Sequence, residues 1–123
     1  MRIELVTEQP DGSGPHWIDV RDRIKGGDIF AVHEASEVPL DADGRTTAIS
    51  YQKLDDDQFA ALAQRVITAW SFPVPVPASV AAAKSVISDL EEDDYWKLYT
   101  ELKPTLDKIK AGAAADPKPP PTN

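Results

Sequence analysis

The chain lacks cysteine altogether, which excludes disulfide bridges and thiolate metal sites. Basic residues are scarce: 13 Lys and Arg stand against 21 Asp and Glu, for a net charge of −8. That surplus of negative charge argues against binding to nucleic acid or to an anionic membrane. Long hydrophobic runs are also missing, since no segment approaches the ~20 apolar residues of a membrane span and the amino terminus has no signal-peptide core. We therefore expect a soluble, acidic, intracellular protein.

The motifs of common catalytic and cofactor sites are absent as well. The glycines at 26 and 27 are not followed by the Lys-Ser/Thr of a phosphate loop, and His33 has no second histidine four residues later, as a zinc-protease helix requires. His16 stands alone. The acidic clusters at 55–57 and 91–94 lack the alternating ligands and central glycine of a calcium loop. We expect no enzyme, no cofactor and no bound metal.

The strongest periodic pattern lies in residues 55–77, DDDQFAALAQRVITAWSFPVPVP. Apolar residues recur there at steps of three and four: Phe59, Leu62, Ala63, Val66, Ile67 and Trp70. This spacing predicts one amphipathic helix that reaches Trp70. The aspartates at 55–57 suit its positive amino-terminal end, and Phe72 before Pro73 ends it. The alternating prolines then hold the chain extended.

The amino-terminal part favours β-structure. Residues 2–7 and 16–20 are strand candidates around a Gly/Pro turn, so they predict a hairpin with Trp17 and Asp19 on one face. Asp28 is the predicted N-cap of a short helix over 29–35. Its inward residues are expected to be Ile29, Phe30 and Val32. The β-branched and aromatic residues of 46–52 predict a third strand.

The carboxyl-terminal part favours helices. Residues 78–90 are compatible with one helix, and an acidic first turn at 91–94 opens another. Its apolar stripe is Tyr95, Leu98, Tyr99, Leu102, Leu106 and Ile109. Pro104 predicts a bend or two short helices meeting near Lys103, and Gly112 is expected to close the element.

The predicted fold is therefore α+β: a small N-terminal antiparallel β-hairpin or sheet with a short helix, followed by a helical part of two main amphipathic helices. We expect residues 1–112 to form a single domain. Residues 113–123, AAADPKPPPTN, have no apolar periodicity and are rich in proline. They predict a disordered or extended tail.

Four aromatic residues are candidates for partner binding: Trp70, Phe72, Trp96 and Tyr99. Trp70 and Phe72 flank the predicted helix end, and Trp96 lies beside the stripe of the last helix rather than on it. Tryptophan and tyrosine are enriched among binding hot spots. The alternative, that these rings belong to the core, stays open. A groove between helices 55–72 and 92–111 is the expected place for a helical partner.

Three segments resemble the small tail assembly chaperones of long-tailed, siphovirus-type bacteriophages, particularly those of actinobacterial hosts. The first is WIDVRD at 17–22 followed by GD at 27–28, and the second is RVITAW at 65–70 followed by Pro73 and Pro75. The third spans 90–106, a closing helix whose acidic first turn follows a leucine. The likeness covers about two-thirds of the chain and includes no catalytic signature.

The resemblance implies a protein that binds the phage tape-measure protein, keeps it soluble and helps tail-tube subunits polymerise around it in the host cytoplasm. Such chaperones are usually absent from the finished virion, and a longer frameshifted product often accompanies them. Self-association would supply the multivalency that the task needs. The alternative is a structural virion protein: a head–tail connector, a tail-tube subunit or a capsid-decoration component. Neither role involves nucleic acid or membrane.

Overall fold

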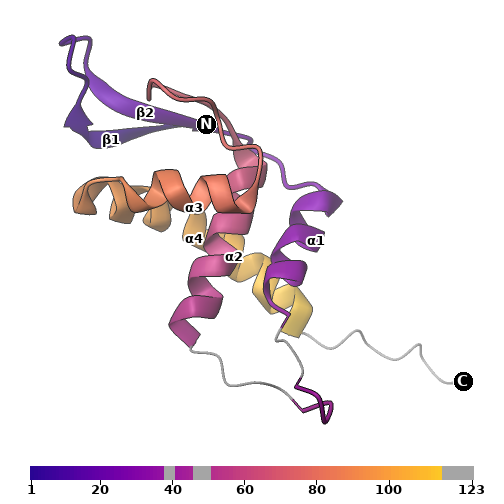
Figure 1. Cartoon of the computed structure of the whole chain (residues 1–123). Helices are drawn as coiled ribbons and strands as arrows, with labels where there is room; N and C mark the ends of the chain where they lie inside the picture. The colour runs from indigo at the N-terminus through magenta and orange to yellow at the C-terminus, as the bar shows by residue number, and fades with distance from the viewer. Residues whose placement is uncertain (38–40, 46–50, 115–123) are drawn as a thin grey trace, which may run out of the picture.

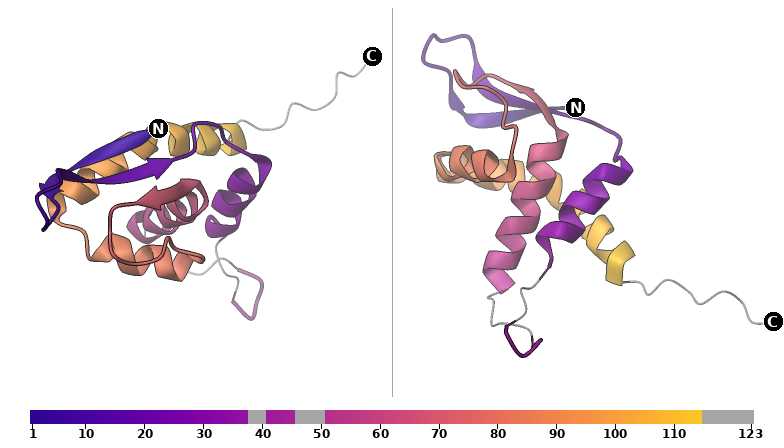
Figure 2. Two further views of the ribbon diagram at one scale, coloured as in Figure 1. Left: turned by 90° about the horizontal axis from the view of Figure 1, so that it is seen from above. Right: turned by 45° about the vertical axis from the view of Figure 1, so that its right-hand side comes forward.

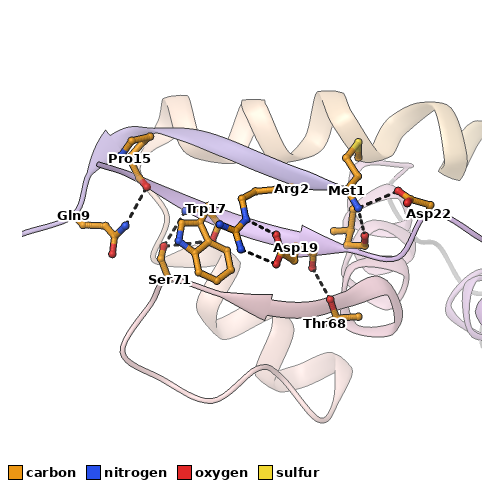
Figure 3. A network of polar contacts seen from close by, with 10 residues as sticks. Met1, Arg2, Gln9, Pro15, Trp17, Asp19, Asp22, Thr68 and Ser71 are labelled. Atoms are coloured by element: carbon orange, nitrogen blue, oxygen red, sulfur yellow. Dashed lines mark hydrogen bonds and ion pairs between the residues drawn. The ribbon is translucent and has the colours of Figure 1, made fainter. Parts of the chain in front are cut away.

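The computed structural model describes residues 1–37, 41–45 and 51–114, and it begins with the predicted hairpin. Strands β1 (Arg2–Glu8) and β2 (Pro15–Val20) pair antiparallel, with Ile3 opposite Ile18. Side chains alternate between the two faces, as the sequence predicted. The apolar members Ile3, Leu5, Ile18 and Val20 are buried. On the outer face, Arg2 binds Asp19 at 2.8 Å and its guanidinium lies 3.8 Å above the Trp17 ring (Figure 3).

The third strand comes from an unexpected part of the chain. Helix α2 (Tyr51–Val66) ends four residues before Trp70, and Ile67–Trp70 form strand β3, which pairs antiparallel with β2. The prediction of one helix reaching Trp70 is therefore wrong. The strand predicted at 46–52 is also wrong at Tyr51 and Gln52, which are helical, while 46–50 lie outside the described residues. The free edge of β2 offers backbone hydrogen bonds to Ile67–Trp70, and these replace the last turn of a helix.

Three helices surround α2: α1 (Gly26–Ala35), α3 (Val80–Ser88) and α4 (Glu92–Ala114). Figures 1 and 2 show α2 in the middle, descending from the sheet, with the other helices packed around it. The hydrophobic core joins one face of the sheet to these helices. Its members are Ile3, Leu5, Ile18, Val20, Val32, Phe59, Leu62, Ala63, Val66, Ile67, Leu98, Leu102, Leu106 and Ile109. The α+β prediction is confirmed.

Two predictions about helix α1 are wrong. Asp28 is not the N-cap; it lies in the first turn, and its carboxylate accepts a hydrogen bond from the backbone N–H of the N-cap residue, Lys25, at 2.8 Å. Only Val32 is buried among the three residues expected to point inward. Phe30 is 73% exposed and Ile29 is 36% exposed. The buried stripe of α1 consists of Asp28 and Val32, one helical turn apart, and Ile29 and Phe30 fall outside it.

A buried ion-pair cluster holds α1 against the rest of the molecule. The Asp28 carboxylate is fully buried and binds Arg21 Nη2 at 2.7 Å and Arg65 Nε at 3.0 Å. Burial opposes its ionisation, but the hydrogen bonds from Arg21, Lys25 N–H and Arg65 outweigh that effect and lower the pKa of Asp28 to about 2. The cluster therefore links α1, the chain after β2 and the end of α2 through one carboxylate.

Because Gly27 has no side chain, the Arg65 guanidinium fits beside it in this cluster. A Cβ atom at Gly27 would collide with the Arg65 guanidinium, whereas one at Gly26 meets nothing within 4 Å. Both glycines lie in the first turn of α1, so alanine should improve the helix equally at either site. We expect Gly27→Ala to be about 0.5–1 kcal/mol less stable than Gly26→Ala in urea unfolding, because the exposed Arg65 guanidinium must move away from Asp28. Equal stabilities would show that the Arg65 contact contributes nothing.

Helix α4 runs without interruption through Pro104. The structure shows one helix, not a bend into two short helices, and Gly112 lies inside it because the helix continues to Ala114. The residues at 113 and 114, assigned by prediction to the tail, are thus helical, and 115–123 lie outside the described residues. Pro104 is exposed, and the stripe on either side of it is buried as predicted. Water can therefore solvate the Thr100 carbonyl, whose helical partner N–H is missing at Pro104.

Pro104→Ala should stabilise the protein. The substitution restores the backbone hydrogen bond to Thr100 and removes the ring's clash, at the cost of a more flexible unfolded chain. We expect the free energy of unfolding to rise by about 1–2 kcal/mol. Lys103→Ala is the control; it loses an exposed pair with Asp107 and a contact 6.0 Å from the Tyr99 ring centroid, together worth about 0.5 kcal/mol. A decrease in stability for Pro104→Ala would contradict this account of α4.

Helix α4 also supports the hairpin through Asp94, which is buried. The Asp94 carboxylate accepts hydrogen bonds from the N–H groups of Val6 and Thr7, at 2.7 and 3.0 Å, and from the Thr7 hydroxyl. These two residues lie where the β1–β2 register shifts between Glu4 and Glu8. A bulge leaves N–H groups without a strand partner, and Asp94 satisfies them.

Candidate functional site

An open groove of 570 Å³ lies between α2, α3 and the start of α4. Its lining residues are Lys53, Asp56, Asp57, Phe59, Ala60, Lys84, Ile87, Ser88, Leu90, Glu92 and Tyr95. The size falls in the range of ordinary ligand and peptide pockets. The expected groove between two helices therefore exists in altered form, because α3 supplies one of its walls.

The interior of the groove is apolar. Phe59 and Ala60 project from α2 and are almost fully buried, while Ile87 and Leu90 pack partly against the core from α3 and the residues after it. Tyr95 meets Phe59 edge-on, with ring centroids 5.8 Å apart. Burial raises the pKa of the Tyr95 hydroxyl, with further contributions from Asp56 and Asp55, so the ring stays neutral.

Charged side chains line the rim of the groove. Asp57 binds Lys53 at 3.0 Å and also forms an ion pair with Lys84, which ties α2 to α3. The hydrogen bond from Lys84 lowers the pKa of Asp57. The predicted role of the aspartates at 55–57, as the first turn of the helix, is wrong because α2 begins at Tyr51 and its first turn contains no acidic residue. Asp55 pairs with α4 and Asp57 with α3, whereas Asp56 accepts a hydrogen bond from Gln52 within α2.

Three aromatic rings on α4 continue from the groove onto the surface. We call Tyr95, Trp96 and Tyr99 the aromatic row. Their ring centroids lie 5.0 Å (Tyr95–Trp96), 5.6 Å (Trp96–Tyr99) and 6.0 Å (Tyr95–Tyr99) apart. Trp96 is 50% exposed. The Tyr99 hydroxyl donates a hydrogen bond to Asp55 at 2.9 Å, and burial together with this bond raises the pKa of Tyr99 to about 12.

The other two candidate residues form a separate pair. Trp70 and Phe72 meet edge-on at 5.5 Å, and His16 stacks on Phe72 at 4.5 Å. The Trp70 indole N–H donates to the Val74 carbonyl at 2.8 Å. Both rings pack against the core from β3 and the segment after it. Across the described parts of the chain, no ring contact joins this pair to Trp96 or Tyr99, so the four candidates form two groups.

Sequence reasoning missed the contribution of α3 to the site. Lys84, Ile87 and Ser88 face the groove, although no periodic stripe distinguished 78–90 from an ordinary surface helix. The available signal was the pair Ile87 and Leu90, spaced three apart at the end of that segment. A second hollow of 600 Å³ lies between α1, α2 and α3, next to the exposed Phe30. Asp57 and Lys84 line both hollows and separate them.

Three general findings complete the description of the molecule. Within residues 1–37, 41–45 and 51–114, no group of three or more His, Cys, Asp or Glu side chains is placed to hold a metal ion. None of the helices in those ranges combines the length and apolar character needed to cross a bilayer. Comparison with protein-family models, with curated proteins and with solved structures finds no match.

Proposed function

We propose that the protein is a phage tail assembly chaperone whose groove binds a helical segment of the tape-measure protein. The observation that carries the proposal is an open, apolar groove, lined in part by Tyr95, on a strongly acidic protein. An apolar hollow of this kind on a small protein is typical of a protein-binding surface. The sequence resemblance to tail assembly chaperones supplies the identity of the partner.

The groove suits the apolar face of an amphipathic helix. Such helices insert anchors spaced three or four residues apart into a hydrophobic channel. Ile87 and Leu90, which are only partly buried, provide the apolar contact surface, and Tyr95 supplies an aromatic wall. Rim charges of both signs, Lys84 and Asp57 among them, can pair with polar residues that flank the anchors. The net charge of −8 would keep a complex with an apolar partner in solution.

In this role the protein acts in the host cytoplasm during tail assembly. It would shield tape-measure segments until tail-tube subunits enclose them, and then leave. Binding through a single open groove suits a contact that must be released. By holding the tape-measure protein in solution, the chain would keep it available to the tail-tube subunits that polymerise around it.

Ser88→Arg tests the proposal by blocking the groove. Ser88 is exposed at the end of α3 and lines the groove, so an arginine there places a long cation across it while suiting the negative end of the helix. Ser85→Arg is the matched control, an exposed serine on the same helix that is not part of the lining. We expect Ser88→Arg to weaken binding to a tape-measure fragment at least about tenfold, measured by calorimetry, and Ser85→Arg to leave it unchanged.

Co-expression gives the cellular readout. A co-expressed tape-measure protein should stay in the supernatant with the wild-type chain and sediment with Ser88→Arg. Equal sedimentation with and without the wild-type chain would contradict the proposal. Mass spectrometry of purified particles separates the structural alternative, because a connector, tube or decoration protein is present in stoichiometric amounts and a chaperone is absent.

A further inference from the structure

The aromatic row has the chemistry of a proline-binding surface. Its three rings lie within 5.0 to 6.0 Å of one another, and Trp96 presents half of its surface to solvent. Clustered tryptophan and tyrosine rings recognise proline-rich segments, because the polyproline II helix is preformed and its rings pack on aromatic faces. The groove does not explain the exposed ring of Trp96, which is not among its lining residues.

Acidic residues surround the aromatic row. Asp55 accepts the Tyr99 hydroxyl hydrogen bond, and Asp56 and Glu92 line the groove next to Tyr95. Two cations nearby are already paired: Lys103, which lies 6.0 Å from the Tyr99 ring centroid, with Asp107, and Lys110 with Asp55 at 3.7 Å. The ligand favoured here therefore combines proline rings with a positive charge.

This chain carries a segment with that composition. Residues 117–121 read PKPPP, with Lys118 between prolines, and they lie beyond the described part of α4. The segment offers four prolines and one cation within five residues. The prolines suit the aromatic rings, and Lys118 suits the acidic residues beside them.

The geometry of α4 prevents the segment from reaching the row of its own chain. At a rise of 1.5 Å per residue, the helix from Tyr99 to Ala114 spans about 22 Å. A polyproline II chain advances about 3.1 Å per residue. The seven residues from 115 to 121 would therefore cover about 22 Å if they ran back along α4 toward Tyr99. Only Pro121 would arrive at Tyr99, and the prolines before it would fall short. A second copy of the chain has no such limit.

We propose that the segment 117–121 of one copy binds the aromatic row of a second copy. Reciprocal exchange of two segments closes a dimer with two-fold symmetry. The contact is independent of the tape-measure protein, so it can hold even if the proposed function fails. It would also give the chain more than one groove per assembly, which raises the strength of binding to a long partner.

Sedimentation velocity of the full chain without any partner tests this proposal. Two variants disable opposite sides of the contact: Trp96→Ala removes the exposed ring, and the triple change Pro119→Ala, Pro120→Ala, Pro121→Ala removes the proline-rich ligand. Each should weaken self-association at least about tenfold. Far-UV circular dichroism checks that both variants remain folded. The three substituted prolines lie outside the described residues. The triple variant therefore still tests the proposal if Trp96→Ala does not fold.

A mixture of the two variants separates exchange between copies from any contact within one chain. Trp96→Ala keeps an intact ligand, and the triple variant keeps an intact aromatic row. We expect each to be monomeric alone and the mixture to form a 1:1 heterodimer through the one remaining contact. A monomeric wild type at up to about 1 mM, variants that associate like the wild type, or a mixture that stays monomeric would each overturn the proposal.

Discussion

Replacing Asp28 with alanine should lower the free energy of unfolding by about 3 kcal/mol, a large share of the 5–15 kcal/mol typical of a small domain. The carboxylate is fully buried and accepts hydrogen bonds from Arg21, Arg65 and the backbone of Lys25. Its loss leaves two guanidinium groups without their anion and one helix N–H without an acceptor. Urea unfolding followed by circular dichroism measures the effect.

Asp107→Ala is the control for this change. It also removes an aspartate from an ion pair, but the partner Lys103 and Asp107 are both about half exposed, so the expected loss is about 0.5 kcal/mol or less. A similar loss for both variants would contradict the account of the buried cluster.

The same cluster predicts how stability depends on pH. Asp28 has a pKa of about 2 in the folded protein and an ordinary value of 3.8, so its folded-state pKa is depressed. A depressed carboxylate contributes stability that is present above about pH 4 and is lost as the pH falls toward 2. We expect Asp28→Asn to be less stable than the wild type at pH 6 by about 2 kcal/mol and nearly equal to it at pH 2. A difference that stays constant between pH 6 and pH 2 would contradict the assignment.

Leu106→Ala should be among the most damaging changes in α4, with an expected loss of about 3–5 kcal/mol. Leu106 is fully buried and lies two residues beyond Pro104, so it packs against the core only if the helix continues through the proline. Leu98→Ala, on the other side of Pro104, should cost a similar amount because Leu98 is equally buried. The measurement is again urea unfolding, with Lys108→Ala as the exposed control.

The comparison between Leu98→Ala and Leu106→Ala tests the continuity of the helix. If the chain bent or frayed at Pro104, Leu106→Ala would cost far less than Leu98→Ala. A loss below about 1 kcal/mol for Leu106→Ala would therefore contradict a single helix from Glu92 to Ala114.

Local patterns in the sequence predicted most of the elements. The alternation of β1 and β2 and the Gly/Pro turn between them specify a hairpin, because the side-chain period and the turn chemistry agree. The stripe from Tyr95 to Ile109 specifies α4 for the same reason, and the exposed position of Pro104 allows the helix to pass through it. In both places the local preference and the tertiary packing point to the same structure.

The end of α2 shows where local patterns fail. Ile67 and Trp70 continue the spacing of the helical stripe, so periodicity alone predicts helix. The β-branched Ile67 and Thr68 also favour a strand, and pairing with β2, almost fifty residues earlier in the chain, decides between the two. A short apolar run can satisfy both periods, and only the neighbouring strand determines which one forms.

Contacts distant in sequence could not be predicted at all. Asp28 meets Arg65 across 37 residues, and Asp94 meets Thr7 across 87. In the sequence, Asp28 and Asp94 each looked like an acidic residue at the start of a helix. Nothing in the sequence indicates which cation or N–H group lies beside either carboxylate. The candidate site shows the same limit: Trp96 and Tyr99 were identified by their spacing, whereas Ile87 and Leu90 became part of the groove only through the packing of α3 on α2.

Cross-linking from the groove tests the central claim, that this groove binds the tape-measure protein, most directly. Because the chain has no cysteine, Ser88→Cys and Ser85→Cys each provide a single attachment site for a photoactivatable cross-linker on the same helix. We predict that the tape-measure fragment is captured from Ser88→Cys, with cross-linked peptides confined to one amphipathic segment, and that Ser85→Cys captures little. Equal capture from both positions, or none from Ser88→Cys, would contradict the claim.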